Sequence, residues 1–200
     1  MKWRALVGGD MKFELAEGNA LFLAAWIGWR KAGAPPRRRD VRLEDIVELL
    51  PGIILLEARA PDVFHFRLAG TGVDEYSGMH MTGVNALDLT APENRATRAR
   101  RLWSLASTPC GGYFRFLHRY PETRAEAPME GIILPVLADA DDAPVQLMSV
   151  FSSSRSRAES EPPSNDMRNA LPDEFYFVDL GFGAPEGEEP VIGLDSLRTV

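Results

Sequence analysis

The segment 64–83 constrains the fold of this chain more than any other stretch of the sequence. It begins with FHFRL, an alternation of apolar and polar residues typical of a strand that covers a core with one face. Gly70 then permits a backbone conformation that would strain other residues. Thr71 is placed to cap a short helix together with Asp74, and Gly78 to close that helix. A strand that leads into short helices is unlike a nucleotide-binding βαβ unit, and it indicates a sensor or binding module.

The size and charge of the chain limit what it can do. Its 200 residues are 45% hydrophobic, which suits one sizeable core with extensions. A formal net charge of -7 argues against general nucleic-acid binding, because phosphate neutralisation needs an excess of Lys and Arg. Cys110 is the only cysteine, so an internal disulfide and a multi-cysteine metal site are excluded. We expect no nucleic-acid partner.

The sequence also suggests where the protein resides. The first ten residues, MKWRALVGGD, lack the apolar core and cleavage site of a secretory signal. The most apolar run, Ala20 to Trp29, has about half the length needed to span a bilayer. We therefore expect a soluble, cytoplasmic protein without a membrane partner.

An N-terminal helix is expected from about Phe13 to Lys31. Its large apolar residues form a stripe wide enough to require cover, either from the domain's own sheet or from a second copy of the chain. The candidate dimer-interface residues are Leu15, Phe22, Leu23, Trp26, Ile27 and Trp29. We expect a homodimer through this helix, and a protein that stays monomeric at high concentration would contradict it.

The middle of the chain predicts an antiparallel α+β domain, in which helices cover one face of a five-stranded sheet. The expected strands are alternating or continuously apolar, and short turns separate the first two and the last three. They span residues 53–58, 63–68, 113–120, 129–137 and 145–151. Pro135 falls inside the fourth strand, where a proline should lie at an edge or an irregularity.

Two further helices are expected beside the short one after Gly70. Leu43 to Leu50 has amphipathic spacing and should end at Pro51. A longer helix should start at the capping-box pattern of Thr90 and Glu93 and run to about residue 106. Its arginines, Arg95, Arg98, Arg100 and Arg101, are expected on a solvated outer face; the alternative is a contact with an acidic partner or a phosphate.

Three regions follow from this pattern: an N-terminal helix and connector (1–42), a core (43–152), and a linker with a C-terminal extension (153–200). The stretch from Ser152 to Asp173 is poor in apolar residues and is expected to be solvated. Phe175 to Val178 either adds a short strand or docks elsewhere.

The order of these elements resembles the PAS fold, a sensor fold in which a five-stranded sheet and its middle helices form a cup. More narrowly, the chain resembles the alphaproteobacterial family of single-PAS proteins formerly catalogued as a domain of unknown function, over about Ala16 to Phe151. The motifs that carry the resemblance are PRRRD at 36–40, DI at 45–46, LLP at 49–51, FRLAGT at 66–71, GMHMTG at 78–83, DL at 88–89 and ILPV at 133–136. It implies a regulatory or sensory domain, often dimeric through its N-terminal helix, whose cup holds a small molecule.

The cup between sheet and helices is the candidate ligand site. Aromatic and methionine side chains dominate its expected lining, which suits a largely apolar ligand. The candidate ligand-binding residues are Phe66, Tyr76, Met79, Met81, Trp103, Phe114, Phe116, His118 and Met148. Arg115 or His118 would orient the ligand; the alternative is that the same side chains simply fill a core.

Neither a catalytic centre nor a metal site is predicted. His65, His80 and His118 lack ligand spacing with another metal-binding side chain. Cys110 stands outside the asparagine-cysteine-arginine motif that photoreactive PAS domains carry. We therefore expect no cofactor, with haem and flavin disfavoured. A nucleophile elbow is also lacking, so we expect that the protein is not an enzyme.

The expected function is that of a regulatory, sensory domain. Occupancy of the cup by an unknown small molecule would shift the packing between the sheet and the N-terminal helix, and so alter a surface for dimerisation or for a signalling protein. Two alternatives stay open. A tightly packed cup would favour a ligand-free interaction module, and His118 beside a buried carboxylate would favour an enzyme acting on a small apolar substrate.

Overall fold

The computed structural model describes residues 13–31, 33–119, 126–153, 171–172, 174–187 and 189–198. The strands of its main sheet are β2 (Ile53–Ala60), β3 (Val63–Ala69), β4 (Gly111–Arg119), β5 (Glu126–Val136), β6 (Gln146–Ser153), β7 (Glu174–Asp179) and β8 (Val191–Gly193). Their order is β3-β2-β6-β5-β4-β7-β8, and neighbours run antiparallel except β7 and β8. A small parallel pair, β1 (Phe13–Glu14) and β9 (Leu197–Arg198), joins the two ends of the described chain.

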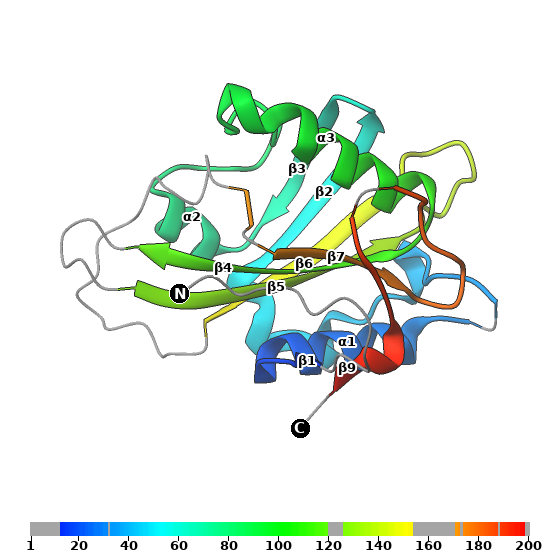
Figure 1. Ribbon diagram of the computed structural model, residues 1–200. Helices are drawn as coiled ribbons and strands as arrows, with labels where there is room; N and C mark the ends of the chain where they lie inside the picture. Colours follow the sequence, from blue (N-terminus) through cyan, green and yellow to red (C-terminus); the bar gives the residue numbers. More distant parts are fainter. Residues whose placement is uncertain are drawn as a thin grey trace.

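A helical layer lies on each face of the sheet. The helices are α1 (Glu17–Trp29), α2 (Thr71–Ser77) and α3 (Pro92–Ser107), with short 3-10 segments η1 (Arg38–Asp40), η2 (Leu43–Gly52) and η3 (Leu194–Ser196). Figure 1 shows α3 on one face of the sheet and α1 on the opposite face. Strand residues alternate between the layers: Ile132 and Leu134 of β5 join the core beneath α1, whereas Phe114 of β4 and Leu147 of β6 join the core beneath α3.

The predicted α+β class is confirmed, and the main sheet has two more strands than the five expected. The five predicted strands are present within a few residues at most ends, and the middle helices cover one face of the sheet. The additional strands, β7 and β8, come from the C-terminal extension. Because β7 pairs with β4 along its length, this part of the extension belongs to the main sheet. None of the described helices combines the length and the apolar character needed to cross a membrane.

Helix α1 packs on the sheet of its own chain. Leu15, Phe22, Leu23, Trp26 and Trp29, which were predicted for a dimer interface, are all buried, whereas Ile27 is exposed. The indole Nε1 of Trp26 donates a 2.9 Å hydrogen bond to the carbonyl of Pro135. The apolar stripe of α1 therefore packs on the sheet of its own chain, which is one of the two alternatives considered above. A dimer stays a prediction, and it would have to use the exposed side of α1.

A carboxylate of the sheet holds the start of α1. Glu130 Oε1 accepts hydrogen bonds from the backbone N–H of Ala16 at 2.6 Å and from Asn19 Nδ2 at 3.0 Å. Its Oε2 accepts one from the hydroxyl of Tyr113 at 3.1 Å. A negative charge at a helix N-terminus is favourable because the first backbone N–H groups carry partial positive charge. Glu130 therefore ties α1 to two neighbouring strands.

Pro135 lies at an irregularity, as its residue type predicts. The pairing of β5 with β4 ends at Ile133 opposite Gly112, whereas the pairing of β5 with β6 continues through Pro135 opposite Leu147. At Pro135, β5 thus pairs with β6 but no longer with β4. A proline, which has no N–H to donate, is tolerated where a strand lacks a neighbour on one side.

Gly70 has a different role from the one predicted. Its φ of -67° and ψ of 158° are ordinary extended values, so conformational freedom does not explain the glycine. A Cβ at this position would instead clash with the backbone carbonyl groups of Leu50 and Pro51. Thr71 is the first residue of α2, not its cap, and Gly70 occupies the cap position. Gly78 does close α2, in the left-handed conformation with φ of 66°.

The start of α3 also differs from the predicted capping box. The cap position is taken by Ala91, because Pro92 occupies the first turn with the φ that a helix start requires. The hydroxyl of Thr90 donates to the carbonyl of Ala86 at 2.8 Å, and so fastens the preceding turn.

The 3-10 segment η2 replaces the predicted amphipathic helix. It continues through Pro51 to Gly52, and Ile46 interrupts it with non-helical backbone angles. Because of this break, the residues predicted for one apolar helix face do not lie on the same side: Ile46 is buried, whereas Leu43 and Val47 are exposed.

Candidate functional site

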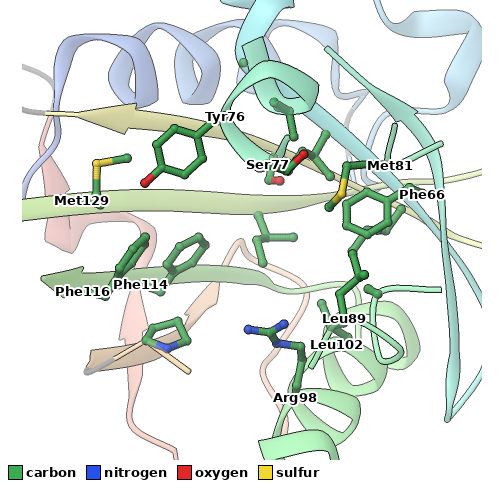
Figure 2. A pocket seen from close by; sticks show the side chains of 18 of the residues that line it. Phe66, Tyr76, Ser77, Met81, Leu89, Arg98, Leu102, Phe114, Phe116 and Met129 are labelled. Carbon is green, nitrogen blue, oxygen red and sulfur yellow. The ribbon is translucent and has the colours of Figure 1, made fainter. Parts of the chain in front are cut away.

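A cavity of about 380 Å³ lies between the sheet and the helices α2 and α3. This volume is in the lower part of the range found for small-molecule sites. Figure 2 shows aromatic and methionine side chains around the space, among them Phe66, Met81, Phe114 and Met129. The predicted cup is therefore present as a hollow, and the side chains of the described residues do not fill it.

Three neighbouring strands build the floor of the cavity. Ser149 of β6 lies opposite Ile54 of β2 on one side and Ile133 of β5 on the other, and all three line the cavity. Gly131 of β5 faces Phe114 of β4, whose ring occupies the place where a Cβ of residue 131 would stand. The glycine thus lets an aromatic ring lie flat on the sheet.

Five of the nine predicted ligand-binding residues line the cavity: Phe66, Tyr76, Met81, Phe114 and Phe116. Met79 and Trp103 pack against the same core but are not among the described lining residues. The side chain of His118 lies outside the described residues.

Met148 was placed on the wrong face. It is buried in the core beneath α1, together with Val150, whereas Leu147 and Ser149 face the α3 side. Successive residues of a strand point to opposite faces, so the apolar character of Met148 alone could not decide its side. The same alternation puts Arg115 on the face of Tyr113, away from the cavity.

Two arginines of α3 also correct a prediction. Arg95 and Arg100 are exposed as expected, but Arg98 and Arg101 line the cavity. The sequence does carry a signal for this arrangement, because Arg98, Arg101, Leu102 and Leu105 follow the spacing i, i+3, i+4, i+7 of one helix face. Leu102 and Leu105 are buried, and they turn both arginines toward the sheet.

Both guanidinium groups are held in place. Arg98 Nη1 donates a 2.9 Å hydrogen bond to Thr90 Oγ1. Burial and, to a smaller extent, the charge of Arg101 lower the pKa of Arg98 to about 10, so Arg98 remains protonated at neutral pH. Arg101 Nε donates to Glu189 Oε1 at 2.8 Å, and its Cζ lies 4.5 Å from the centre of the Phe175 ring.

The C-terminal extension closes one side of the cavity. Leu171, Pro172 and Phe175 are part of the lining. Glu189, from the same extension, pairs with Arg101. The sequence did not predict this contribution, because the pairing of β7 with β4 depends on contacts between residues far apart in the chain.

None of the candidate cofactor ligands whose side chains the structure describes is among the lining residues of the cavity. His80 is exposed, and its Nδ1 lies 2.8 Å from Asp74 Oδ2. Cys110 is buried, which raises the pKa of its thiol to about 12 and keeps it protonated. Neither Cys110 nor His65 is among the described lining residues, and no group of three potential metal ligands gathers in the described part of the chain.

Asp74 fastens the loop that carries Met81 into the cavity. Its Oδ1 accepts a 3.0 Å hydrogen bond from the Met81 backbone N–H, which is the main reason why the pKa of Asp74 is below its usual value of 3.8; His80 lowers it further. A carboxyl with a lowered pKa in the folded state stabilises the protein above its unfolded pKa, and this contribution is lost as the pH falls through the folded value.

We expect that the difference in unfolding free energy between wild type and Asp74→Asn is largest at neutral pH and shrinks below about pH 3.8. Urea unfolding at a series of pH values measures it. Asp88→Asn, at an exposed position, controls for the loss of one negative charge. A difference that stays constant down to the lowest pH would show that the Asp74 charge does not stabilise this loop.

A match to a known sequence family agrees with this architecture. A sequence model of a family described as PAS domain matches residues 16–151, from the start of α1 into β6. No curated protein matches. Eight chains of solved structures match, among them the Rhodobacter sphaeroides LOV protein, which is 16% identical with a TM-score of 0.36. That alignment covers 55% of this chain and 62% of the length of the LOV protein chain.

Proposed function

The chain belongs to the PAS domain family, and we propose that it senses a small, largely apolar molecule that binds in the cavity between the sheet and the helices α2 and α3. PAS domains are sensory and regulatory domains, and this role holds for the chain as a member of the family. The cavity of about 380 Å³ is the observation that carries the proposal.

The cavity supports ligand binding over a ligand-free interaction module. Protein interiors are normally packed as densely as organic crystals, with few voids larger than a water molecule. A space of this size leaves apolar side chains such as Phe66, Met81, Phe114 and Met129 without protein contacts on one side. A small apolar molecule would restore those contacts.

We propose further that the sheet transmits occupancy to α1. The strands of the cavity floor present alternate residues to the two faces: Ile133 and Ser149 face the cavity, whereas Ile132, Leu134 and Val150 lie beneath α1. A shift of these strands on binding would therefore change the packing under α1. The surface changed in this way, whether for a second copy or for a signalling protein, is part of the proposal.

The described lining supports a ligand held by packing and charge. It contains no histidine and no cysteine, the groups that would ligate haem or form a flavin adduct. It also contains no carboxylate, so the acid–base pair required by the enzyme alternative is not present among the described lining residues.

Native mass spectrometry of the protein purified from its own cells tests the ligand. We expect a bound small molecule on the wild-type chain and none on Ser149→Phe, which places a ring at the centre of the cavity floor. Ser107→Phe adds the same ring at an exposed position at the end of α3 and should keep the ligand. A wild-type chain that never carries a small molecule, or a ligand that persists in Ser149→Phe, would contradict binding in this cavity.

A further inference from the structure

The charges in the cavity wall indicate what kind of small molecule the cavity takes. Arg98 and Arg101 are the charged residues of the described lining, and both are basic. Figure 2 shows the guanidinium group of Arg98 extending from α3 into the space that Leu102, Phe114 and Tyr76 surround. A positive charge beside an apolar space attracts an anion much more strongly than it would in water.

Arg101 offers a hydrogen-bond donor to such an anion. Its Nε is used by Glu189, and its plane lies over the ring of Phe175, so the orientation of the group is fixed. Its Nη1 atom is buried and has no hydrogen-bond partner among the described residues. Buried donors are nearly always paired, so this one, on a residue that lines the cavity, indicates an acceptor that the described residues do not supply.

Glu189 does not supply an acceptor for Nη1 of Arg101. Its Oε1 is shared between Arg101 Nε at 2.8 Å and Arg100 Nη2 at 3.3 Å, while Nη1 of Arg101 stays without an acceptor in the described part of the chain. A second carboxylate from inside the cavity could accept from that atom and lie close to Arg98 as well. Arginine is well suited to this, because its planar fork matches a carboxylate.

The rest of the wall defines the other part of the ligand. Apart from the two arginines, the lining is mostly aliphatic, aromatic or thioether, with Tyr76, Ser77 and Ser149 as its polar side chains. An anion without an apolar body would leave these surfaces uncovered, and a purely apolar molecule would leave Nη1 of Arg101 without an acceptor.

We propose that the ligand is an amphipathic carboxylic acid, whose apolar body fills the cavity and whose carboxylate binds Arg98 and Arg101. This inference rests on the proposed function, since it names the chemical class of the sensed molecule. Decanoate is a suitable probe. If each of its twelve heavy atoms takes about the 30 Å³ of a liquid water molecule, it occupies about 360 Å³, close to the volume of the cavity.

The test compares three probes with the same chain and different head groups, decanoate, 1-decanol and decylammonium, by isothermal titration calorimetry on the full chain. We expect decanoate to bind at least about tenfold more tightly than 1-decanol, since charge-assisted hydrogen bonds to a guanidinium contribute that much, and decylammonium to bind most weakly. Arg101→Met should remove the preference for decanoate over 1-decanol. Arg95→Met, on the exposed side of the same helix, should preserve it.

The head-group series on the wild-type chain decides the inference even if Arg101→Met fails to fold. Equal affinities for decanoate and 1-decanol would overturn the carboxylate while leaving a sensor of apolar molecules intact. A preference that persists in folded Arg101→Met would overturn the assignment to this arginine. If none of the three probes binds, the inference fails, and the small molecule found by native mass spectrometry decides the proposed function separately.

Discussion

Replacing Gly70 with alanine is expected to lower the free energy of unfolding by about 3 kcal/mol, near the upper end for overpacked sites. The added Cβ would clash with the carbonyl groups of Leu50 and Pro51, which are backbone atoms and cannot turn away as a side chain would. Gly70 itself cannot move easily, because its N–H donates to the carbonyl of Ile53 at 2.8 Å and its carbonyl accepts from Val73 at 2.9 Å. Urea unfolding followed by circular dichroism measures the change.

Gly28→Ala is the matched control for this substitution. Gly28 lies on the exposed side of α1, and a Cβ there would meet no atom within 4 Å. Alanine is a better helix former than glycine, so this variant should be more stable than wild type by about 0.5–1 kcal/mol. If Gly70→Ala were as stable as wild type, η2 would not pack as closely against the start of α2 as the structure shows. The position of Pro51 and Gly72 in the cavity wall would then be in error as well.

The contrast between these glycines shows what sequence patterns can and cannot predict. The stop after β3 was predicted correctly at Gly70, because a glycine after an alternating run marks a strand end. The reason why a glycine is needed at this position was not predicted, since the close approach of the Leu50 backbone depends on tertiary packing. At Gly78 the reason could be predicted, because closure of a short helix by a left-handed residue is a local property.

The same distinction applies to the candidate site. Phe66, Phe114 and Phe116 were placed correctly because the strand period assigns them to one face, and Met148 was not because its face depends on register.

The family resemblance, predicted over about Ala16 to Phe151, is confirmed over residues 16–151.

The charged part of the site escaped prediction for a different reason. Arg98 and Arg101 belong to a run of arginines, and such runs usually form a solvated face. Their spacing with Leu102 and Leu105 indicates that they lie on the helix face that meets the sheet. It does not indicate that a cavity lies between that face and the sheet. The closure of the cavity by Phe175 requires the pairing of β7 with β4, which no local pattern encodes.

Replacing Trp26 with alanine is expected to lower the free energy of unfolding by about 4 kcal/mol, a typical loss for a large aromatic side chain removed from a core. Trp26 has no solvent exposure, and its ring joins α1 to the sheet face opposite the cavity. Thermal and urea unfolding measure the change. Leu21→Ala, on the exposed side of the same helix, should alter stability by no more than about 0.5 kcal/mol.

Trp26→Phe separates packing from hydrogen bonding at this position. It keeps an aromatic ring but leaves the buried carbonyl of Pro135 without the indole donor, so a smaller loss of about 1–3 kcal/mol is expected. If Trp26→Ala were no less stable than Leu21→Ala, α1 would not be docked on the sheet as the structure shows. If a shift of the strands changes the free energy of α1 docking by about 1.4 kcal/mol, the ratio of docked to undocked α1 changes tenfold. Binding in the cavity could therefore be read out at α1 without any direct contact between the two.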